Sequence, residues 1–178
     1  MDLTSAVLVR LAHPQEHDAI RDLTLSAYGQ YATIMEPWAW NGLRDAIEAA
    51  LSMDRGAQRI VAERGGELVG AVMLFPASAD AYGALGPRVR SPEIRVLAVA
   101  PHARGLGVAR LLVSECMRRA REAGAEAIGL HTSRSMRDAI RLYEKCGFTR
   151  DPEFDIRVEG AEGIEAYRLA LSSPLPGA

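Results

Sequence analysis

The sequence lacks the long apolar run that a membrane-spanning helix requires. Its longest apolar run, LVGAVMLF at positions 68–75, is far shorter than the ~20 residues that cross a bilayer. The amino-terminal stretch, MDLTSAVLVRLAHP, has an acid at position 2, and its apolar part is too short and interrupted for a secretory signal. We therefore expect a cytoplasmic protein with no membrane partner.

Cysteine is also scarce, and the net charge is small. The two cysteines, Cys116 and Cys146, both fall on apolar faces of predicted helices. We expect buried thiols rather than a disulfide, as in a reducing cytoplasm. A formal net charge of −2 and a pI near 6.1 give no basic surface overall, so we expect no nucleic-acid partner.

Several common site motifs are missing. No Lys-Ser or Lys-Thr pair occurs, which excludes a P-loop, and no Gly-x-Ser-x-Gly elbow supports a hydrolase. His13 and His17 stand four residues apart, but the sequence offers no third ligand beside them. We expect no metal site.

Hydrophobic periodicity predicts an α+β fold with a mixed sheet and one parallel crossover. A single domain is expected over residues 1–172, and the tail 173–178 should fray. Between the predicted elements, the stretch 76–92 is long for a compact domain, and such loops are usually functional or disordered. Strands are predicted at 6–12, 59–64, 67–75, 93–100, 126–132, 148–157 and 163–171, and helices at 14–28, 43–53, 105–123 and 135–146.

Glycines mark the turn where the strand at 93–100 passes into the following helix, in EIRVLAVAPHARGLGVARLL. Bare backbone N–H groups and the helix dipole at such a turn favour a bound anion. A dinucleotide fingerprint is met only in part, because Arg110 stands where the third glycine or alanine is needed. The pattern Arg/Gln-x-x-Gly-x-Gly/Ala is met in full by residues 104–109.

Together with AIRLYEKCGF at 139–148, this turn resembles the GNAT superfamily of acyl-CoA-dependent N-acetyltransferases. The resemblance covers roughly residues 58–150. It implies a GNAT-like, mostly antiparallel sheet of six to seven strands with about four helices, and acetyl-CoA (or a longer acyl-CoA) as co-substrate. The alternative is that the glycines only end the strand. By resemblance, the pyrophosphate is held by Arg104, Gly105, Leu106, Gly107, Val108 and Ala109, and the pantetheine arm by backbone groups of Leu97, Ala98 and Val99.

Amide formation from an amine and a thioester requires an acid and a base. Tyr143 is the candidate acid, because its neutral phenol can donate a proton to the departing sulfur and the family has a similar tyrosine. Glu93 is the candidate base, directly or through water. The alternatives are that Tyr143 only packs on an apolar helix face and that Glu93 is an exposed carboxylate at a strand end.

One departure from the family concerns Met136, which stands where relatives often have an asparagine that helps to hold the cofactor. Ser133 or Ser135 can substitute, but we expect Ser135 to cap the helix with Asp138 completing a capping box. His131 should pack or cap, with the lining of an acceptor pocket as the alternative.

By resemblance to GNAT-like folds, the acceptor site is expected around the region that links the first two helices. Trp38 and Trp40 are candidates for an aromatic wall, or for a staple between a loop and the core. The loop at 76–92 offers Arg88 or Arg90 to an acidic group on the acceptor.

These patterns predict an N-acetyltransferase in which a primary amine attacks the bound thioester directly in a ternary complex. No cysteine stands in a plausible nucleophile position, so no acyl-enzyme is expected. The alternatives are a non-catalytic acyl-CoA-binding sensor or partner-binding module and, more remotely, a nucleotide-binding oxidoreductase. The acceptor stays open among small-molecule and peptide amines, and a homodimer is expected from the resemblance.

Overall fold

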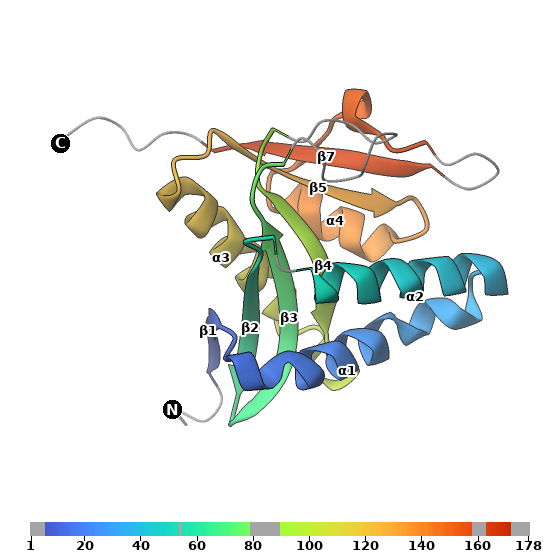
Figure 1. The fold of residues 1–178 in the computed structure, drawn as a ribbon, viewed down its shortest axis with the longest axis vertical. Helices are drawn as coiled ribbons and strands as arrows, with labels where there is room; N and C mark the ends of the chain where they lie inside the picture. The colour runs from blue at the N-terminus through green and yellow to red at the C-terminus, as the bar shows by residue number, and fades with distance from the viewer. Residues whose placement is uncertain (1–5, 54, 79–89, 158–162, 172–178) are drawn as a thin grey trace. The chain divides into compact units, whose positions relative to one another are not determined.

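A computed structural model describes residues 6–53, 55–78, 90–157 and 163–171 of the chain, and its helices and strands follow one another in the predicted order (Figure 1). Strands are β1 (Val7–Leu11), β2 (Gln58–Arg64), β3 (Glu67–Phe75), β4 (Glu93–Val99), β5 (Ala127–Ser133), β6 (Thr149–Arg150) and β7 (Ile164–Ala170). Helices are α1 (His17–Tyr28), α2 (Pro37–Ser52), α3 (Val108–Glu122) and α4 (Arg137–Lys145). Short 3₁₀ turns are η2 (Pro14–Glu16), η3 (Gly29–Thr33), η4 (Pro101–Ala103) and η5 (Pro152–Phe154).

Within these described ranges, seven strands form one sheet in the order β1-β2-β3-β4-β5-β7-β6. The pairs β1–β2, β2–β3, β5–β7 and β6–β7 are antiparallel. The pair β4–β5 is parallel, with Glu93 opposite Gly129 and Ile94 opposite Leu130. The predicted α+β class, with a mostly antiparallel sheet and one parallel crossover, is confirmed.

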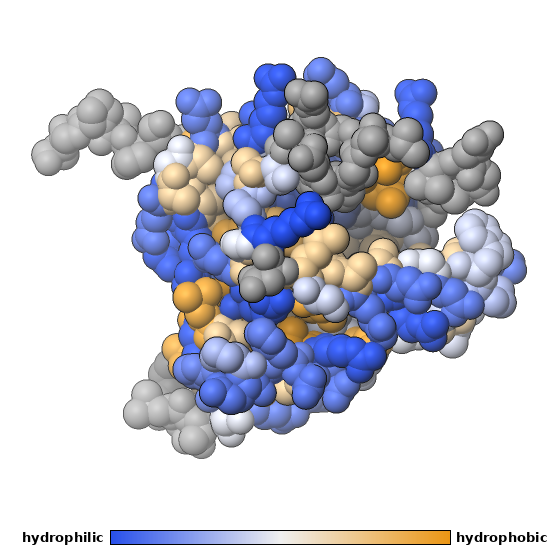
Figure 2. All heavy atoms as spheres, in the orientation of Figure 1, coloured by the Kyte–Doolittle hydropathy of each residue, from blue (hydrophilic) through white to orange (hydrophobic). Residues whose placement is uncertain are grey.

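The chain divides into two compact units. The first comprises residues 1–74 and 95–113, and the second comprises residues 75–94 and 114–178. In the first unit, α1 and α2 lie against each other (Figure 1), and the surface that they present in Figure 2 is mostly hydrophilic. Ile20 of α1 packs with Val61 of β2 and Ala71 of β3 in an apolar cluster.

The second unit is built around β5. Its residues Ala127, Ile128 and Leu130 are almost fully buried, and the strand pairs with β7 along its whole length, from Ala127 opposite Ala170 to Ser133 opposite Ile164. A strand buried on both faces reads as a nearly continuous apolar run, as AIGL does here. In the sheet, β5 lies between β4 and β7.

Several predicted boundaries are wrong, and a proline explains two of them. α2 begins at Pro37 rather than at 43, because proline at the first helical position has the backbone angle of a helix and needs no N–H there. The strand predicted at 148–157 is only two residues long, because Pro152 starts η5. Only an isolated bridge from Ile156 to Ile164 continues the pairing.

The capping prediction for Ser135 is also wrong. The N-cap of α4 is Met136, and no side chain caps that helix end. The hydroxyl of Ser133 instead accepts a hydrogen bond from the backbone N–H of Ser135 at 3.3 Å, so both serines are used in the turn that precedes α4.

Some predictions fall outside the described part of the chain. They concern the tail 173–178 and, within the loop at 76–92, residues 79–89 with Arg88. The single domain over 1–172 stays a prediction. No described helix combines the length and the apolar character that crossing a membrane requires.

Gly70, in the middle of β3, sets how closely α3 packs on the first unit. A Cβ atom at this position would lie 2.8 Å from Cγ1 of Val108, 3.0 Å from Cδ1 of Leu112 and 3.1 Å from the carbonyl oxygen of Ala98. Real Cβ contacts do not reach 2.8 Å, so the glycine is required by close approach rather than by backbone angle. Gly70 thus seats the first turns of α3.

We predict that Gly70→Ala destabilises the protein by about 1–3 kcal/mol, because the added methyl group overpacks this contact. The free energy of unfolding from urea denaturation measures the effect. Gly42→Ala is the matched control, since nothing lies within 4 Å of its added Cβ and alanine favours the helix that contains it. A Gly70→Ala variant as stable as wild type would contradict the close approach.

Candidate active site

The glycine turn precedes α3 in the first unit. Gly105 and Gly107 both have a φ of 79°, in the left-handed region that favours glycine, and nothing lies within 4 Å of a Cβ added to either. Their side is therefore open, and the requirement for glycine is conformational. α3 begins at Val108 rather than at 105, since these two backbones are not helical.

The first turn of α3 presents backbone donors. The N–H of Leu111 reaches the carbonyl oxygen of Gly107 at 3.1 Å, and the N–H groups before it have no intrahelical acceptor. Those N–H groups and the positive end of the helix dipole favour an anion at this place. The predicted residues Leu106, Val108 and Ala109 lie on this stretch, with the Leu106 side chain 48% exposed and the Val108 side chain in the core.

The side chain of Arg104 points elsewhere. Its guanidinium donates to the carbonyl oxygen of Ala27 at 3.0 Å and to Oε1 of Gln30 at 2.9 Å. Ala27 lies in the last turn of α1, where carbonyl groups lack helical partners and a cation is favourable. Arg104 thus ties the turn to the end of α1, and the turn's contribution to an anion site comes from its backbone.

β4 carries a strained residue in its middle. Val96 has a φ of 55°, the only left-handed backbone among the described non-glycine residues. Such a conformation costs a β-branched residue about 1–3 kcal/mol and is typical of functional sites. The half-buried Leu97 and Val99 flank Ala98, which is buried.

Glu93 is not the exposed strand-end carboxylate of the alternative interpretation. It is 2% exposed, and its Oε1 lies 2.8 Å from Nδ1 of His131. The parallel register places Glu93 opposite Gly129, two residues before His131 on the same face of β5. His131 therefore does more than pack, and its contact with Glu93 is one that sequence reasoning missed.

The second ring nitrogen of His131 settles where the protons lie. Nε2 is 2.8 Å from the carbonyl oxygen of Phe154, which can only accept, so Nε2 carries a proton and donates it. One further proton is then needed between Nδ1 and the carboxylate of Glu93. The Glu93–His131 pair therefore holds one shared proton in a buried place.

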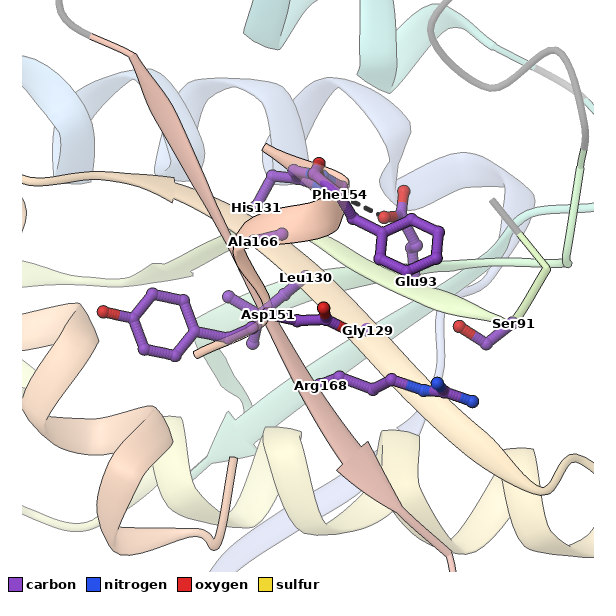
Figure 3. Close-up of a pocket in the computed structure, with 10 residues that line it drawn as sticks. Ser91, Glu93, Gly129, Leu130, His131, Asp151, Phe154, Ala166 and Arg168 are labelled. Atoms are coloured by element: carbon purple, nitrogen blue, oxygen red, sulfur yellow. Dashed lines mark hydrogen bonds and ion pairs between the residues drawn. The ribbon is translucent and has the colours of Figure 1, made fainter. Parts of the chain in front are cut away.

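This pair borders a small cavity of about 30 Å³ within the second unit (Figure 3). Figure 3 shows the carboxylate of Glu93 and the imidazole of His131 turned toward each other beside Phe154. A volume of this size holds one or two water molecules. The cavity is lined by Ser91, Glu93, Gly129, Leu130, His131, Asp151, Phe154, Ala166, Tyr167 and Arg168.

Arg150 holds the segment that supplies the Phe154 carbonyl. Its two terminal nitrogens each lie 2.6 Å from an oxygen of Asp155, and one also donates to the carbonyl oxygen of Ala166 on β7. The N–H of Ala166 donates to Asp155 in return, at 2.9 Å. The hydrogen bonds from Arg150 and Ala166 outweigh burial and lower the pKa of Asp155. η5 is therefore clamped onto β7.

Tyr143 lies on α4, in the same unit as the Glu93–His131 pair. It is 7% exposed, and its ring meets the edge of Phe148 at 5.9 Å between centroids. Packing and a proton-donor role are both compatible with this placement, so the role of Tyr143 stays a prediction.

Both cysteines are free thiols, but only one is buried. Cys116 is fully buried in α3, and burial raises the pKa of its thiol to about 12, which leaves no thiolate at neutral pH. Cys146 is half-buried rather than buried as predicted.

The tryptophans of the predicted acceptor region lie in the first turns of α2. Trp38 is 61% exposed and Trp40 is half-buried, so Trp38 is no staple to the core. Arg90 is exposed. The described residues contain no cluster of three or more histidine, cysteine, aspartate or glutamate side chains arranged to hold a metal ion.

Comparison with known proteins gives the family. The model of the acetyltransferase (GNAT) family matches residues 18–148. The chain belongs to this family, which confirms the resemblance drawn from the sequence.

Individual relatives match parts of the chain. A mycothiol acetyltransferase of Thermomonospora curvata is 43% identical over 58 residues, 33% of this chain and 20% of the relative. N-acetyltransferase 8B of Rattus norvegicus is 31% identical over 133 residues, 74% of this chain and 57% of the relative. The chain thus spans about a fifth to somewhat over half of these relatives' length.

A solved structure shares the fold. The structure of yncA from Salmonella typhimurium with its cofactor acetyl-CoA has a TM-score of 0.64 and 20% sequence identity, and the match covers 96% of this chain and 97% of that one.

We predict that Asp155→Asn lowers the free energy of unfolding at pH 7 by about 1–2 kcal/mol, because it removes a charge-assisted pair. Asp155 has a lowered pKa in the folded protein, so its stabilisation is present above its unfolded pKa of about 3.9 and is lost as pH falls through the lower folded value. Urea denaturation at several pH values should show wild type and variant converging in acid. Glu153→Gln, an exposed change in the same turn, is the control, and an equal loss at all pH values would contradict the ion pair.

Proposed function

We propose that this chain transfers an acetyl group from acetyl-CoA to a primary amine by direct attack of the amine on the bound thioester. The observation that carries the proposal is the buried Glu93–His131 pair beside a cavity, in a member of the acetyltransferase family. The acceptor is a small-molecule or peptide amine. The expected cytoplasmic location and homodimer stay predictions.

The donor is assigned to the glycine turn. The backbone N–H groups of residues 105–109 suit a pyrophosphate, because the positive end of α3 and the open side of both glycines allow close approach. Backbone groups of Leu97, Ala98 and Val99 take the pantetheine arm. Acetyl-CoA as the ligand of a related fold in yncA supports this choice. At position 136, methionine has no amide group, so its side chain cannot make the contact that the family's asparagine makes with the cofactor.

In this chemistry the acceptor nitrogen loses two protons and the departing sulfur gains one. Glu93 receives a proton from the incoming ammonium group, while His131 orients the carboxylate through the Nδ1 contact. The amine nitrogen then bonds to the thioester carbon and the carbon–sulfur bond breaks. Tyr143 protonates the departing thiolate and regains a proton, through water, from the attacking nitrogen as the amide forms. The raised pKa of Cys116 argues against a covalent acyl-enzyme.

We predict that acetyl-CoA raises the thermal unfolding midpoint by a few degrees, whereas NAD and ATP do not. A ligand that binds only the folded state stabilises it by ~2.7 kcal/mol at a hundred times its Kd. Gly107→Ala should weaken acetyl-CoA binding by about tenfold, since alanine disfavours the left-handed turn by ~1–2 kcal/mol.

Gly124→Ala is the matched control for this binding measurement. Gly124 has a φ of 77° and nothing within 4 Å of an added Cβ, but it lies at the other end of α3. Both variants should lose similar stability, and only Gly107→Ala should lose affinity. A rise in the unfolding midpoint with NAD alone would instead indicate that the turn binds a dinucleotide.

We predict that Tyr143→Phe lowers kcat by about 10²-fold or more and leaves acetyl-CoA affinity unchanged, because the phenol acts on the leaving group. Glu93→Gln should lower kcat by a similar factor, whereas Glu126→Gln, exposed just before β5, should not. Steady-state rates and acetyl-CoA titration measure both effects. A chain that binds acetyl-CoA and turns over no amine would instead be the non-catalytic acyl-CoA-binding module.

A further inference from the structure

A carboxylate residue, a glycine and an arginine lie next to one another on three neighbouring strands. Glu93 of β4 pairs with Gly129 of β5, and Gly129 pairs with Arg168 of β7. Paired residues present their side chains on the same face of a sheet. At a strand spacing of ~4.8 Å, the Cα atoms of Glu93 and Arg168 are about 10 Å apart, with no side chain between them.

Gly129 is the floor of the cavity. A Cβ atom added to it would lie 3.6 Å from Oγ of Ser91 and 3.9 Å from Cγ of Glu93, both of which line the cavity. Any larger side chain at position 129 would therefore fill the space between the side chains of Glu93 and Arg168. The cavity, with a volume of about 30 Å³, admits only a small polar group and the atoms bonded directly to it.

The two ends of this cavity carry opposite charges. At one end, the carboxylate of Glu93 is turned to His131. Asp151, whose backbone N–H donates to the carbonyl oxygen of Ala166 on β7, also lines the cavity. Arg168 extends toward the Ser91 side (Figure 3), and within the described part of the chain its guanidinium makes no ion pair. The carboxylate of Glu93 suits an ammonium group, and the planar guanidinium suits a carboxylate.

We propose that this cavity selects an acceptor that carries a carboxylate close to its primary amine, as free amino acids do. The proposal rests on the acetyl-transfer function proposed above. Glu93 takes the amine end, Arg168 binds the acceptor's carboxylate, and the missing side chain of Gly129 gives room for the carbon atoms between them.

Matched substrate pairs test this selection with the full chain and acetyl-CoA. Each free L-amino acid of a set is compared with its amide, which keeps the amine and loses the negative charge. The amide's amine gives up its proton more readily, so intrinsic reactivity favours the amide. We expect kcat/KM to be about 10- to 100-fold higher for the acids, the usual effect of a charge-assisted contact.

Variants assign the preference to residues. Arg168→Gln should bring the ratio of kcat/KM for acid and amide toward one. Arg121→Gln, which removes an exposed arginine from α3, should keep the ratio. Gly129→Ala should lower kcat/KM for both substrate series, because its methyl group enters the cavity.

The possible outcomes separate this proposal from the proposed function. Amides or simple alkylamines acetylated as well as the acids would overturn the selection and leave acetyl transfer intact. Acetyl-CoA binding without acetylation of any amine would overturn both. A ratio that survives Arg168→Gln would overturn the role of Arg168, and a preference for O-phosphoethanolamine over every amino acid would replace the carboxylate by a phosphate.

Discussion

A buried carboxylate constrains the second unit. Glu93 is 2% exposed, and an ionised carboxylate taken out of water without a partner costs several kcal/mol. His131 compensates it only because β5 lies beside β4 in a parallel register that brings the two side chains to one face. The other ring nitrogen of His131 in turn requires the Phe154 carbonyl, which Arg150 and Asp155 hold in place.

The glycine turn in the first unit depends on different interactions. In the first unit, the close approach allowed by Gly70 seats α3, and two left-handed glycines expose the first N–H groups of that helix. The Arg104 side chain serves the end of α1. An anion at this turn would be bound by backbone groups, which explains why the motif specifies glycines more strictly than side-chain donors.

Local signals predicted most elements well, and their failures have local causes too. The second helix was predicted to begin at 43, although Pro37 suits a first helical position and starts it. Pro152 shortened β6, since it cannot continue the pairing. Serine is a common N-cap residue, but Ser135 lies one position before the N-cap of α4, which is Met136. Its backbone N–H donates to the hydroxyl of Ser133.

The sequence by itself determined the fold class, the glycine turn with its helix, and the candidacy of Glu93 and Tyr143, because each depends on residues close together in the chain. Only the tertiary structure decided that Glu93 is buried against His131, that Phe154 orients that ring, and that Gly129 separates Glu93 from Arg168. These relations depend on strand register between segments far apart in the chain. Register is set by the packing of whole strands, so no local pattern of residues reveals it.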